Sequence, residues 1–204
     1  MVKEKLSAAV TVLLILLLAA PLPCRAGEPS EVIGRMRDSA IAILTDAGLD
    51  PAQRVERIRS LVTDNVNFAE MSRRILAVNW KKADPDQRER FAVLFRDLLE
   101  ATYIDYIDEY SDETVQVVRE RVKETRAIVD TIFITGDNEI PVVYKLLLRD
   151  GRWKVIDISI EDVSLVSNYR ETYGEIAARD GIEGLLEQMA EQIEKMRAEK
   201  ATEN

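Results

Sequence analysis

The residues with the clearest chemical potential lie in one stretch, WKVIDISIEDVSLVSNYR, which runs from Trp153 to Arg170. The pattern indicates a strand that turns abruptly into a helix, and it brings Asp, Ser, Asn, Tyr and Arg side chains together. A Ser beside an Asp is a poor nucleophile when no His or Lys activates it. A carboxylate at such a junction can instead accept backbone N–H groups, and Ser164 has the position of a helix N-cap. We therefore predict that Asp157 and Ser164 are structural hydrogen-bonding residues and that neither is catalytic.

Carboxylates are the only abundant catalytic type of side chain, and one group of them is concentrated in sequence. A glycosidase needs two carboxylates that face each other across a cleft, one of them with a raised pKa. These acids all belong to one segment beside Ser111, where a solvated helix end is expected. We interpret the group as a charged surface. Its members are Asp105, Asp108, Glu109, Asp112 and Glu113.

Several classes of site lack their residues in this chain. There is no His, and the single Cys is Cys24. In a mature chain that has lost Cys24 with its N-terminal segment, a zinc site of the Cys/His type, a Cys nucleophile and a Ser-His-Asp triad cannot be assembled. A glycine-rich phosphate loop is not expected either, because Gly174, Gly181 and Gly184 fall in or beside the predicted C-terminal helices. We expect no catalytic residues, no metal and no cofactor.

The first 26 residues have the three-part pattern of a secretory signal peptide. Lys3 and Lys5 precede an apolar run over residues 6–20, and small residues then allow cleavage after Ala26. The apolar run is shorter than the roughly 20 residues of a membrane span. Acylation of Cys24 is the alternative, but a Pro precedes that Cys where lipoprotein signals have a small residue. We predict a signal peptide over residues 1–26 and a periplasmic protein made of one domain over residues 27–204.

The charge of the chain is strongly acidic. The full sequence carries a net charge of −9, with 28 basic and 37 acidic side chains. Cleavage after Ala26 removes three basic residues and one acid, which leaves −11. Such a charge repels nucleic acid and anionic bilayer surfaces. We therefore expect a soluble protein that meets membranes through docking proteins.

Helical signals dominate the first half of the chain and return at its end. Apolar residues recur at helical spacing after Pro29, after Asp50-Pro51, after Asn67 and after Asp84-Pro85. Asp50, Asn67 and Asp84 are each suited to cap the helix that follows. Two further helices are predicted after Ser164, with Asp180-Gly181 between them.

The segment between these helical regions has the composition of strands. Runs rich in Val, Ile, Thr and aromatic residues cover residues 114–122, 126–135, 139–149 and 152–160. Short Gly-containing turns join the last three runs, which predicts an antiparallel meander. Apolar residues occupy both faces of the second and third strands, although a sheet with one solvated face should alternate. Either a helix covers the second face, or helices stand off from the sheet and leave an apolar cavity.

Three separated segments resemble one known family. They are the Trp153–Arg170 stretch, NFAEMSRRILAVNW ending at Trp80, and RERFAVLFRDLLEATY ending at Tyr103. In sequence, order and spacing they resemble the MlaC family of periplasmic phospholipid-binding proteins, also called toluene-tolerance proteins. The resemblance covers about residues 30–195. In the Trp153–Arg170 stretch it rests on Trp153, Val155, Asp157, Val163, Ser164, Leu165, Tyr169 and Arg170.

The resemblance implies a carrier and not an enzyme. It implies an α+β fold, with a twisted four-stranded antiparallel sheet packed against several helices and an apolar lipid cavity between them. The cargo would be phospholipid, and the chain would act as a monomer. It would shuttle lipid between an inner-membrane ABC transporter with an MCE-domain subunit and an outer-membrane lipoprotein complex, and so maintain outer-membrane asymmetry. Two other functions stay open: an envelope interaction domain with a solid core, and a carboxylate-dependent hydrolase.

Two positions depart from the family pattern. Asp162 stands where the family usually has Gly before Val-Ser, and Ala77-Val78-Asn79 replaces a link that usually contains Gly. Both departures affect local backbone geometry.

We predict that ten side chains line the lipid cavity. They come from the long central helix, from the sheet and from the junction, and the facing of the sheet positions depends on a strand register that sequence does not fix. The predicted lining residues are Leu94, Leu98, Val129, Phe133, Val143, Leu147, Ile158, Val163, Val166 and Tyr169.

Overall fold

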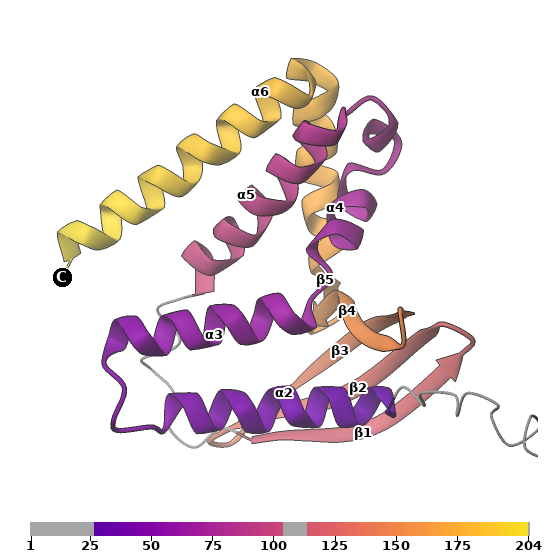
Figure 1. Ribbon diagram of the computed structural model, residues 1–204, viewed down its shortest axis with the longest axis vertical. Helices are drawn as coiled ribbons and strands as arrows, with labels where there is room; N and C mark the ends of the chain where they lie inside the picture. Colours follow the sequence, from indigo (N-terminus) through magenta and orange to yellow (C-terminus); the bar gives the residue numbers. More distant parts are fainter. Residues whose placement is uncertain (1–26, 104–113, 204) are drawn as a thin grey trace, which may run out of the picture.

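The computed structural model describes residues 27–103 and 114–203. In these ranges the chain forms helices, then a sheet, then a long final helix (Figure 1). The helical elements that precede the sheet are α2 (Pro29–Leu44), α3 (Pro51–Asn65), α4 (Phe68–Leu76), the 3-10 helix η1 (Ala77–Lys81) and α5 (Pro85–Tyr103). The sheet consists of β1 (Thr114–Lys123), β2 (Arg126–Thr135), β3 (Asn138–Arg149), β4 (Arg152–Ile160) and β5 (Val163–Ser164), and α6 (Leu165–Glu203) follows it.

The helix starts confirm the predicted caps. Asp50 and Gln53 form a reciprocal capping box at the start of α3, with backbone-to-side-chain distances of 2.8 and 3.1 Å. The Asn67 side chain accepts the Glu70 N–H at 2.9 Å at the start of α4. Asp84 accepts the Gln87 N–H at 2.8 Å before α5. These caps satisfy N–H groups that have no partner within the helix.

The sheet is an antiparallel meander with the order β1-β2-β3-β4-β5. The four predicted strands agree with β1 to β4 to within one residue at each end. The prediction of four strands is nevertheless wrong, because Val163–Ser164 pairs back onto Ser159 and Ile160 as a fifth strand. This pairing follows from a tight turn at Glu161 and Asp162, which both have positive φ, 48° and 67°. Consecutive residues in this conformation reverse the chain within a hairpin.

One face of the sheet forms the core. Residues directly opposite each other in an antiparallel pair share a face. Val129 is opposite Tyr144, and Tyr144 is opposite Ile158. On this face the buried residues of β2, β3 and β4 are Ala127, Val129, Thr131, Val142, Leu146, Trp153 and Val155. On the opposite face the apolar side chains are half-buried, as at Ile128, Ile132, Val143 and Leu147.

The helices form two groups around the sheet (Figure 1). α2 and α3 lie side by side along it, whereas α4, α5 and the first part of α6 pack together above it. Rings from α4, α5 and α6 meet inside this second group, with centroid separations of 5.1–6.5 Å. The rings belong to Phe68, Phe91, Phe95, Tyr169 and Tyr173. Such aromatic contacts add to the energy of burial and join the three helices into one unit.

The final helix changes direction once. At Gly181 the backbone has φ 75° and ψ 180°, which is non-helical. The predicted break at Asp180-Gly181 is therefore confirmed as a kink. A residue with a side chain would be strained in this conformation. The kink lets the second half of α6 pack back along α5 (Figure 1).

Both departures from the family's Gly pattern lie at left-handed backbone positions. Asp162 has φ 67°, as described above. Ala77 has φ 48° and ψ −113° where α4 passes into η1. Non-Gly residues pay a conformational cost at positive φ, and Asp tolerates it better than Ala. Ala77 is exposed, so its methyl group gains little packing in return.

The variant Ala77→Gly should therefore raise the free energy of unfolding by about 1 kcal/mol. Urea denaturation at constant m-value measures the change. Ala178→Gly is the matched control, because Ala178 is an exposed residue inside helical α6. There the same substitution should lower the free energy of unfolding by about 0.5–1 kcal/mol. Changes of the same sign in both variants would contradict a backbone cost at Ala77.

Candidate lipid site and its junction

The junction between sheet and helices is built around the carboxylate of Asp157, which is 4% exposed. Lys145 on β3 donates to its Oδ2 at 2.7 Å. The Ser164 hydroxyl on β5 lies 2.8 and 3.0 Å from the two carboxylate oxygens. The backbone N–H of Val166 on α6 donates to Oδ1 at 3.2 Å. One buried charge thus joins β3, β4, β5 and α6.

A β-bulge places this carboxylate. Lys145 is opposite Asp157, whereas Leu146 is opposite Val155, so Ile156 is an extra residue in β4. Without the bulge Val155 and Asp157 would point to the same face. With it, Val155 packs into the core while Asp157 points to the side of Lys145. Within β4, the alternation between residues that face the core and residues that face away from it therefore shifts by one position at the bulge.

Ser164 also caps α6, as predicted. Its Oγ accepts the Ser167 N–H at 3.1 Å, three residues into the turn. Arg170, which the sequence places near Asp157, binds elsewhere. Its Nε donates to the Arg74 carbonyl at 2.8 Å, at the C-terminal end of α4. The junction is therefore a structural connection between the sheet and two helices.

A second buried carboxylate stabilises α4. Arg73 and Arg74 donate to Glu70 at 2.7–2.8 Å. The hydrogen bond from Arg73 is the main cause that lowers the pKa of Glu70, with a further contribution from Arg74. The guanidinium groups keep this carboxylate charged although it is buried.

The structure brings most of the predicted lining residues to the core face. Leu98, Val129 and Val166 are buried in the main core, and Leu94, Ile158 and Tyr169 are half-buried against it. Burial raises the pKa of Tyr169. Phe133 lies on the same face of the sheet, because Phe133 is in register with Ile140 and Val129 with Tyr144. The role of these seven residues in lipid binding stays a prediction.

Three of the predicted lining residues are placed elsewhere. Val143 and Leu147 lie on the face opposite to Val129 and Phe133, because odd positions of β2 pair with even positions of β3. Val163 is 60% exposed, although its pairing with Ile160 puts it on the same face as Val142, because that end of the sheet is open to solvent. The register thus separates Val143 and Leu147 from the other predicted sheet positions, and the role of these three residues in lining a cavity stays a prediction.

Helix α3 is the least buried helix around the core. None of its residues is buried. Its apolar stripe consists of Val55, Ile58, Leu61 and Val62, and all four are half-buried. A helix held by so little apolar contact gains little stability from packing. Polar contacts therefore matter more for its position than for that of the other helices.

An ion pair joins α3 to α5. Arg59 binds both carboxylate oxygens of Glu100, with an Nε–Oε2 distance of 2.8 Å. Arg59 also pairs with Glu56 within α3. The hydrogen bond from Arg59 is the main cause that lowers the pKa of Glu100 below its ordinary value of 4.5. Bidentate pairs of this kind fix geometry as well as charge.

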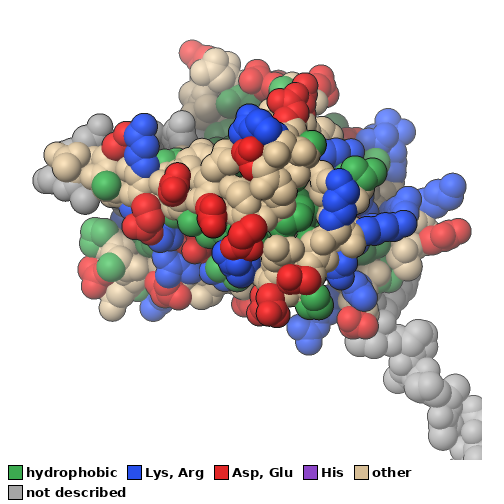
Figure 2. Space-filling model, turned by 90° about the horizontal axis from the view of Figure 1, so that it is seen from above, with side chains coloured by type: hydrophobic (Ala, Val, Ile, Leu, Met, Phe, Trp, Pro, Cys, Tyr) green, Lys and Arg blue, Asp and Glu red, His purple; other side chains and the backbone are tan. Residues whose placement is uncertain are grey.

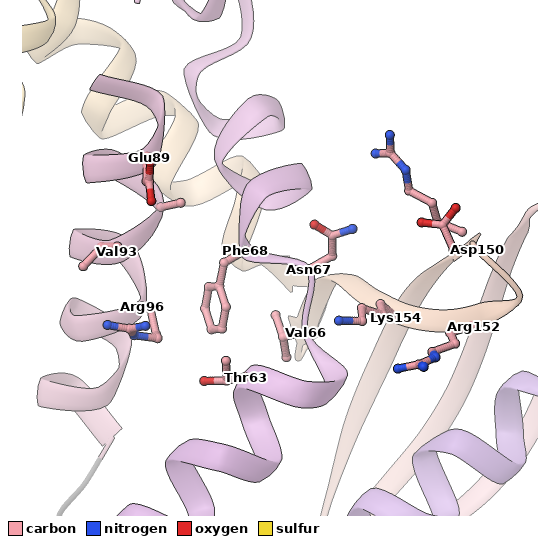
Figure 3. Close-up of a pocket in the computed structure, with 12 residues that line it drawn as sticks. Thr63, Val66, Asn67, Phe68, Glu89, Val93, Arg96, Asp150, Arg152 and Lys154 are labelled. Atoms are coloured by element: carbon pink, nitrogen blue, oxygen red, sulfur yellow. The ribbon is translucent and has the colours of Figure 1, made fainter. Parts of the chain in front are cut away.

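A groove of about 520 Å³ opens one helical turn away from this ion pair (Figure 3). Val93 and Arg96 of α5 form one wall, Arg152 and Lys154 of β4 form the other, and Phe68 lies between them. The apolar floor is continuous with the core, because the Phe68 ring packs against the buried Phe95 at 6.5 Å. The remaining lining residues are Thr63, Val66, Asn67, Glu89, Ala92, Arg149 and Asp150.

None of the ten predicted lining residues lines this groove. Its walls come from the end of α3, from α5 and from the β3–β4 turn, which are far apart in sequence. Two local features of the sequence point to parts of this groove. Phe68 is an aromatic residue at the start of a short helix, and three basic residues surround the Asp150-Gly151 turn.

A smaller hollow of about 350 Å³ lies along α6 near its kink. Tyr173 reaches it, and its buried hydroxyl has no hydrogen-bond partner among the described residues. Burial raises the pKa of Tyr173. The hollow is lined mainly by polar ends and core side chains of α6, and nothing in it suggests catalysis.

Three further observations concern residues 27–103 and 114–203 only. They contain no group of three acidic, Cys or His side chains that could hold a metal ion. Their helices include none with the length and apolar character needed to cross a membrane. The predicted signal peptide, with Cys24, lies outside the described residues, and so does the acidic group over residues 105–113.

Comparisons with known proteins agree on one family. A family model described as "MlaC protein" matches residues 35–191. The intermembrane phospholipid transport system binding protein MlaC of Haemophilus influenzae is 23% identical over 138 residues, which are 65% of this chain and 64% of that protein. The toluene tolerance protein ttg2D of Pseudomonas putida is 25% identical over 114 residues, 54% of this chain and 53% of the relative. The chain thus spans less than two thirds of the length of both relatives.

A solved structure shares the fold. It is a phospholipid-binding protein from Ralstonia solanacearum in complex with a phospholipid, with a TM-score of 0.77 and 19% sequence identity. The match covers 84% of this chain and 99% of the other.

The cap at Ser164 leads to a stability prediction. Ser164→Ala removes the acceptor for the Ser167 N–H and one donor to Asp157, and should lower the free energy of unfolding by about 1–2 kcal/mol. Urea denaturation measures it. Ser167→Ala is the control, because Ser167 is exposed on the same turn and should change stability by less than about 0.5 kcal/mol. Equal effects of the two substitutions would argue against the cap.

The Arg59–Glu100 pair leads to a prediction about pH. Because the pKa of Glu100 is lowered by folding, the pair contributes its full stability above the ordinary value of 4.5 and loses it as the pH falls below that value. Glu100→Gln should therefore cost about 1 kcal/mol or less at pH 7, since Arg59 is partly solvated, and should cost progressively less in acid.

Amide exchange and urea denaturation at several pH values test this prediction. Glu100→Gln should raise exchange throughout α3 at pH 7, whereas the control Glu56→Gln removes a partner within the same helix and should leave α3 attached. A cost of Glu100→Gln that is as large in acid as at pH 7 would contradict the assignment.

Proposed function

The chain belongs to the MlaC protein family, and on this premise we propose that it binds phospholipid and carries it between membranes. The names of its relatives supply the cargo, since one is a phospholipid transport binding protein and a structural neighbour holds a phospholipid. The observation in this chain that carries the proposal is the groove between α5 and the β3–β4 turn. It is open, its floor is apolar, and the floor is continuous with the core.

Acyl chains supply the binding energy in this proposal. Transfer of a methylene group from water to an apolar site contributes about 0.8 kcal/mol. A few methylene groups on the floor around Val66, Phe68 and Val93 therefore give useful affinity without any catalytic group. The groove volume is within the range of small-molecule sites, about 300–1,000 Å³.

The core face of the sheet would receive the deeper parts of the chains. The proposed lining there is the set of predicted residues that the structure keeps together: Leu94, Leu98, Val129, Phe133, Ile158, Val166 and Tyr169. Because Leu98, Val129 and Val166 are buried, acyl chains reach them only if a wall moves. Helix α3 is the wall best suited to move, because none of its residues is buried and its contact with α5 includes the partly exposed Arg59–Glu100 ion pair.

The proposal extends to location and partners. The signal-peptide pattern over residues 1–26 supports the periplasm. The family resemblance suggests an inner-membrane ABC transporter with an MCE-domain subunit and an outer-membrane lipoprotein complex as partners. The net charge, −9 for the full sequence and −11 after cleavage at Ala26, supports transfer through such proteins, because anionic bilayers repel an acidic protein. In this role the chain acts as a non-catalytic monomer.

A specific observation favours one other function. Leu98, Val129 and Val166 pack in a continuous core with side chains from α2, α4, α5 and α6. A solid core of this kind would also suit a plain interaction domain of the envelope. That domain would hold no lipid.

Native mass spectrometry of the protein purified from its own periplasm separates the two functions. We expect a mass increment that lipid extraction resolves into intact phospholipid. A bare mass that persists after incubation with phospholipid vesicles and the membrane partners would support the interaction domain. Released fatty acid in place of intact lipid would point to a hydrolase.

A pair of substitutions tests the groove itself. Val93 is 41% exposed in the groove wall, so Val93→Trp fills the groove without crowding the core. It should reduce lipid occupancy severalfold and leave the free energy of unfolding within about 0.5 kcal/mol. Val122→Trp is the control, since Val122 is 51% exposed on β1 and lies outside the groove. Equal occupancy in both variants would remove the groove from the proposed path.

A further inference from the structure

The β3–β4 turn concentrates positive charge at the rim of the groove. Arg149 and Arg152 are directly opposite each other across the hairpin. Lys154 follows Arg152 by two residues and therefore points to the same side of β4. Like charges in directly opposite positions destabilise a strand pair. None of the three forms an ion pair with another described residue.

A fourth cation lies across the groove. Arg96 on α5 lines the other wall and is two-thirds buried, with its guanidinium bound to Asp97 at 2.8 and 3.0 Å. Figure 3 shows the apolar side chains of Val66 and Phe68 between Arg96 on one side and Arg152 and Lys154 on the other. The rim at the β3–β4 turn is therefore cationic, the opposite rim carries the Arg96–Asp97 ion pair, and the surface between them is apolar.

This charge contrasts with the rest of the molecule. The chain has a net charge of −9, but the groove is lined by four basic side chains and only two acidic ones, Glu89 and Asp150. In Figure 2, acidic side chains are spread over the visible face, whereas Lys and Arg gather toward the right-hand end. The β1–β2 and β3–β4 turns lie at the right-hand end of the sheet in Figure 1. A local cationic site in an acidic protein favours an anionic ligand.

We propose that Arg152 and Lys154, with Arg149 and Arg96, form a binding site for the phosphodiester of a phospholipid head group at the rim of the groove. The inference rests on the proposed function and assigns the polar end of the cargo. A phosphodiester bears one negative charge and accepts several charge-assisted hydrogen bonds, which Arg and Lys supply. Its acyl chains would lie on the apolar floor beneath it. With Arg96 paired to Asp97, the other three basic residues exceed the two acids of the lining by one, which suits this single charge. A bound phosphodiester would also offset the repulsion between Arg149 and Arg152.

The test compares two lipids with the same acyl chains. Protein stripped of lipid is incubated with vesicles that contain either phosphatidylglycerol or diacylglycerol, and native mass spectrometry measures the occupancy. Wild-type protein should take up phosphatidylglycerol at least roughly tenfold in preference to diacylglycerol, since two or more charge-assisted hydrogen bonds distinguish them. Arg152→Gln/Lys154→Gln should lose most of that preference while it still takes up diacylglycerol. High salt should weaken the preference of the wild-type protein, because the rim is partly exposed.

A matched double variant controls for net charge. Lys81→Gln/Arg119→Gln makes the same change at two exposed residues outside the groove, and it should keep the preference. A loss of preference in this control as large as in the groove variant would overturn the site, because it would reduce the effect to overall charge. Circular dichroism verifies that each variant is folded.

The remaining outcomes separate the two proposals. Equal uptake of both lipids by the wild-type protein would overturn the head-group site and leave the carrier intact. No uptake of either lipid would overturn the carrier, and the head-group site with it. Inorganic phosphate is the other source of this anion. If millimolar phosphate binds to the wild-type protein and not to the groove variant, while both load phosphatidylglycerol equally, the rim is a free-phosphate site and the lipid assignment is wrong.

Discussion

The attachment of the sheet to the helices depends on one buried carboxylate. Asp157 accepts hydrogen bonds from a Lys, a Ser and a backbone N–H that belong to three different elements. A buried charge is tolerated only while its partners remain in place. Movement of β3, β5 or the start of α6 would each remove one of the donors to this carboxylate. The junction therefore fixes the start of α6 on the sheet, and a motion that admits a ligand costs less free energy away from it.

Local features of the fold could be predicted from sequence, and long-range ones could not. Asp50, Asn67, Asp84 and Ser164 cap the helices that their sequence positions indicate, because a cap involves residues only three apart. The ends of β1 to β4 could also be predicted, because the turns that separate the strands are local in sequence. Strand facing depends on register, which pairs odd positions of β2 with even ones of β3 and so separates Val129 from Val143. The bulge at Ile156 then shifts the alternation again, and no residue type in β4 signals it.

The groove could not be predicted from the sequence, because its lining residues come from segments that are far apart in the chain. Arg152 and Lys154 look like ordinary solvated strand residues, and Val93 looks like a surface position of an amphipathic helix. Only the tertiary arrangement places them around Phe68. The half-burial of the apolar stripe on α3 also depends on the tertiary arrangement, because the helical spacing of its apolar residues alone predicts a fully packed helix. Positions where a protein departs from the local sequence rules are concentrated at functional sites. The half-buried stripe and the open groove are adjacent at the end of α3, where Val62 and Thr63 follow each other in sequence.

The distribution of charge bears on how a carrier of this kind would exchange its cargo. At distances beyond about 10 Å the acidic surface repels an anionic membrane, and salt screens that repulsion. At contact distance the cationic rim attracts a phosphate. Because the attraction acts only at contact distance, a lipid would enter only after the groove has been brought against the membrane or protein that supplies it. In the proposed function, a protein partner supplies that approach. Helix α3 ends beside the groove and has no buried residue, so its Arg59–Glu100 ion pair to α5 bears on how far the groove can open.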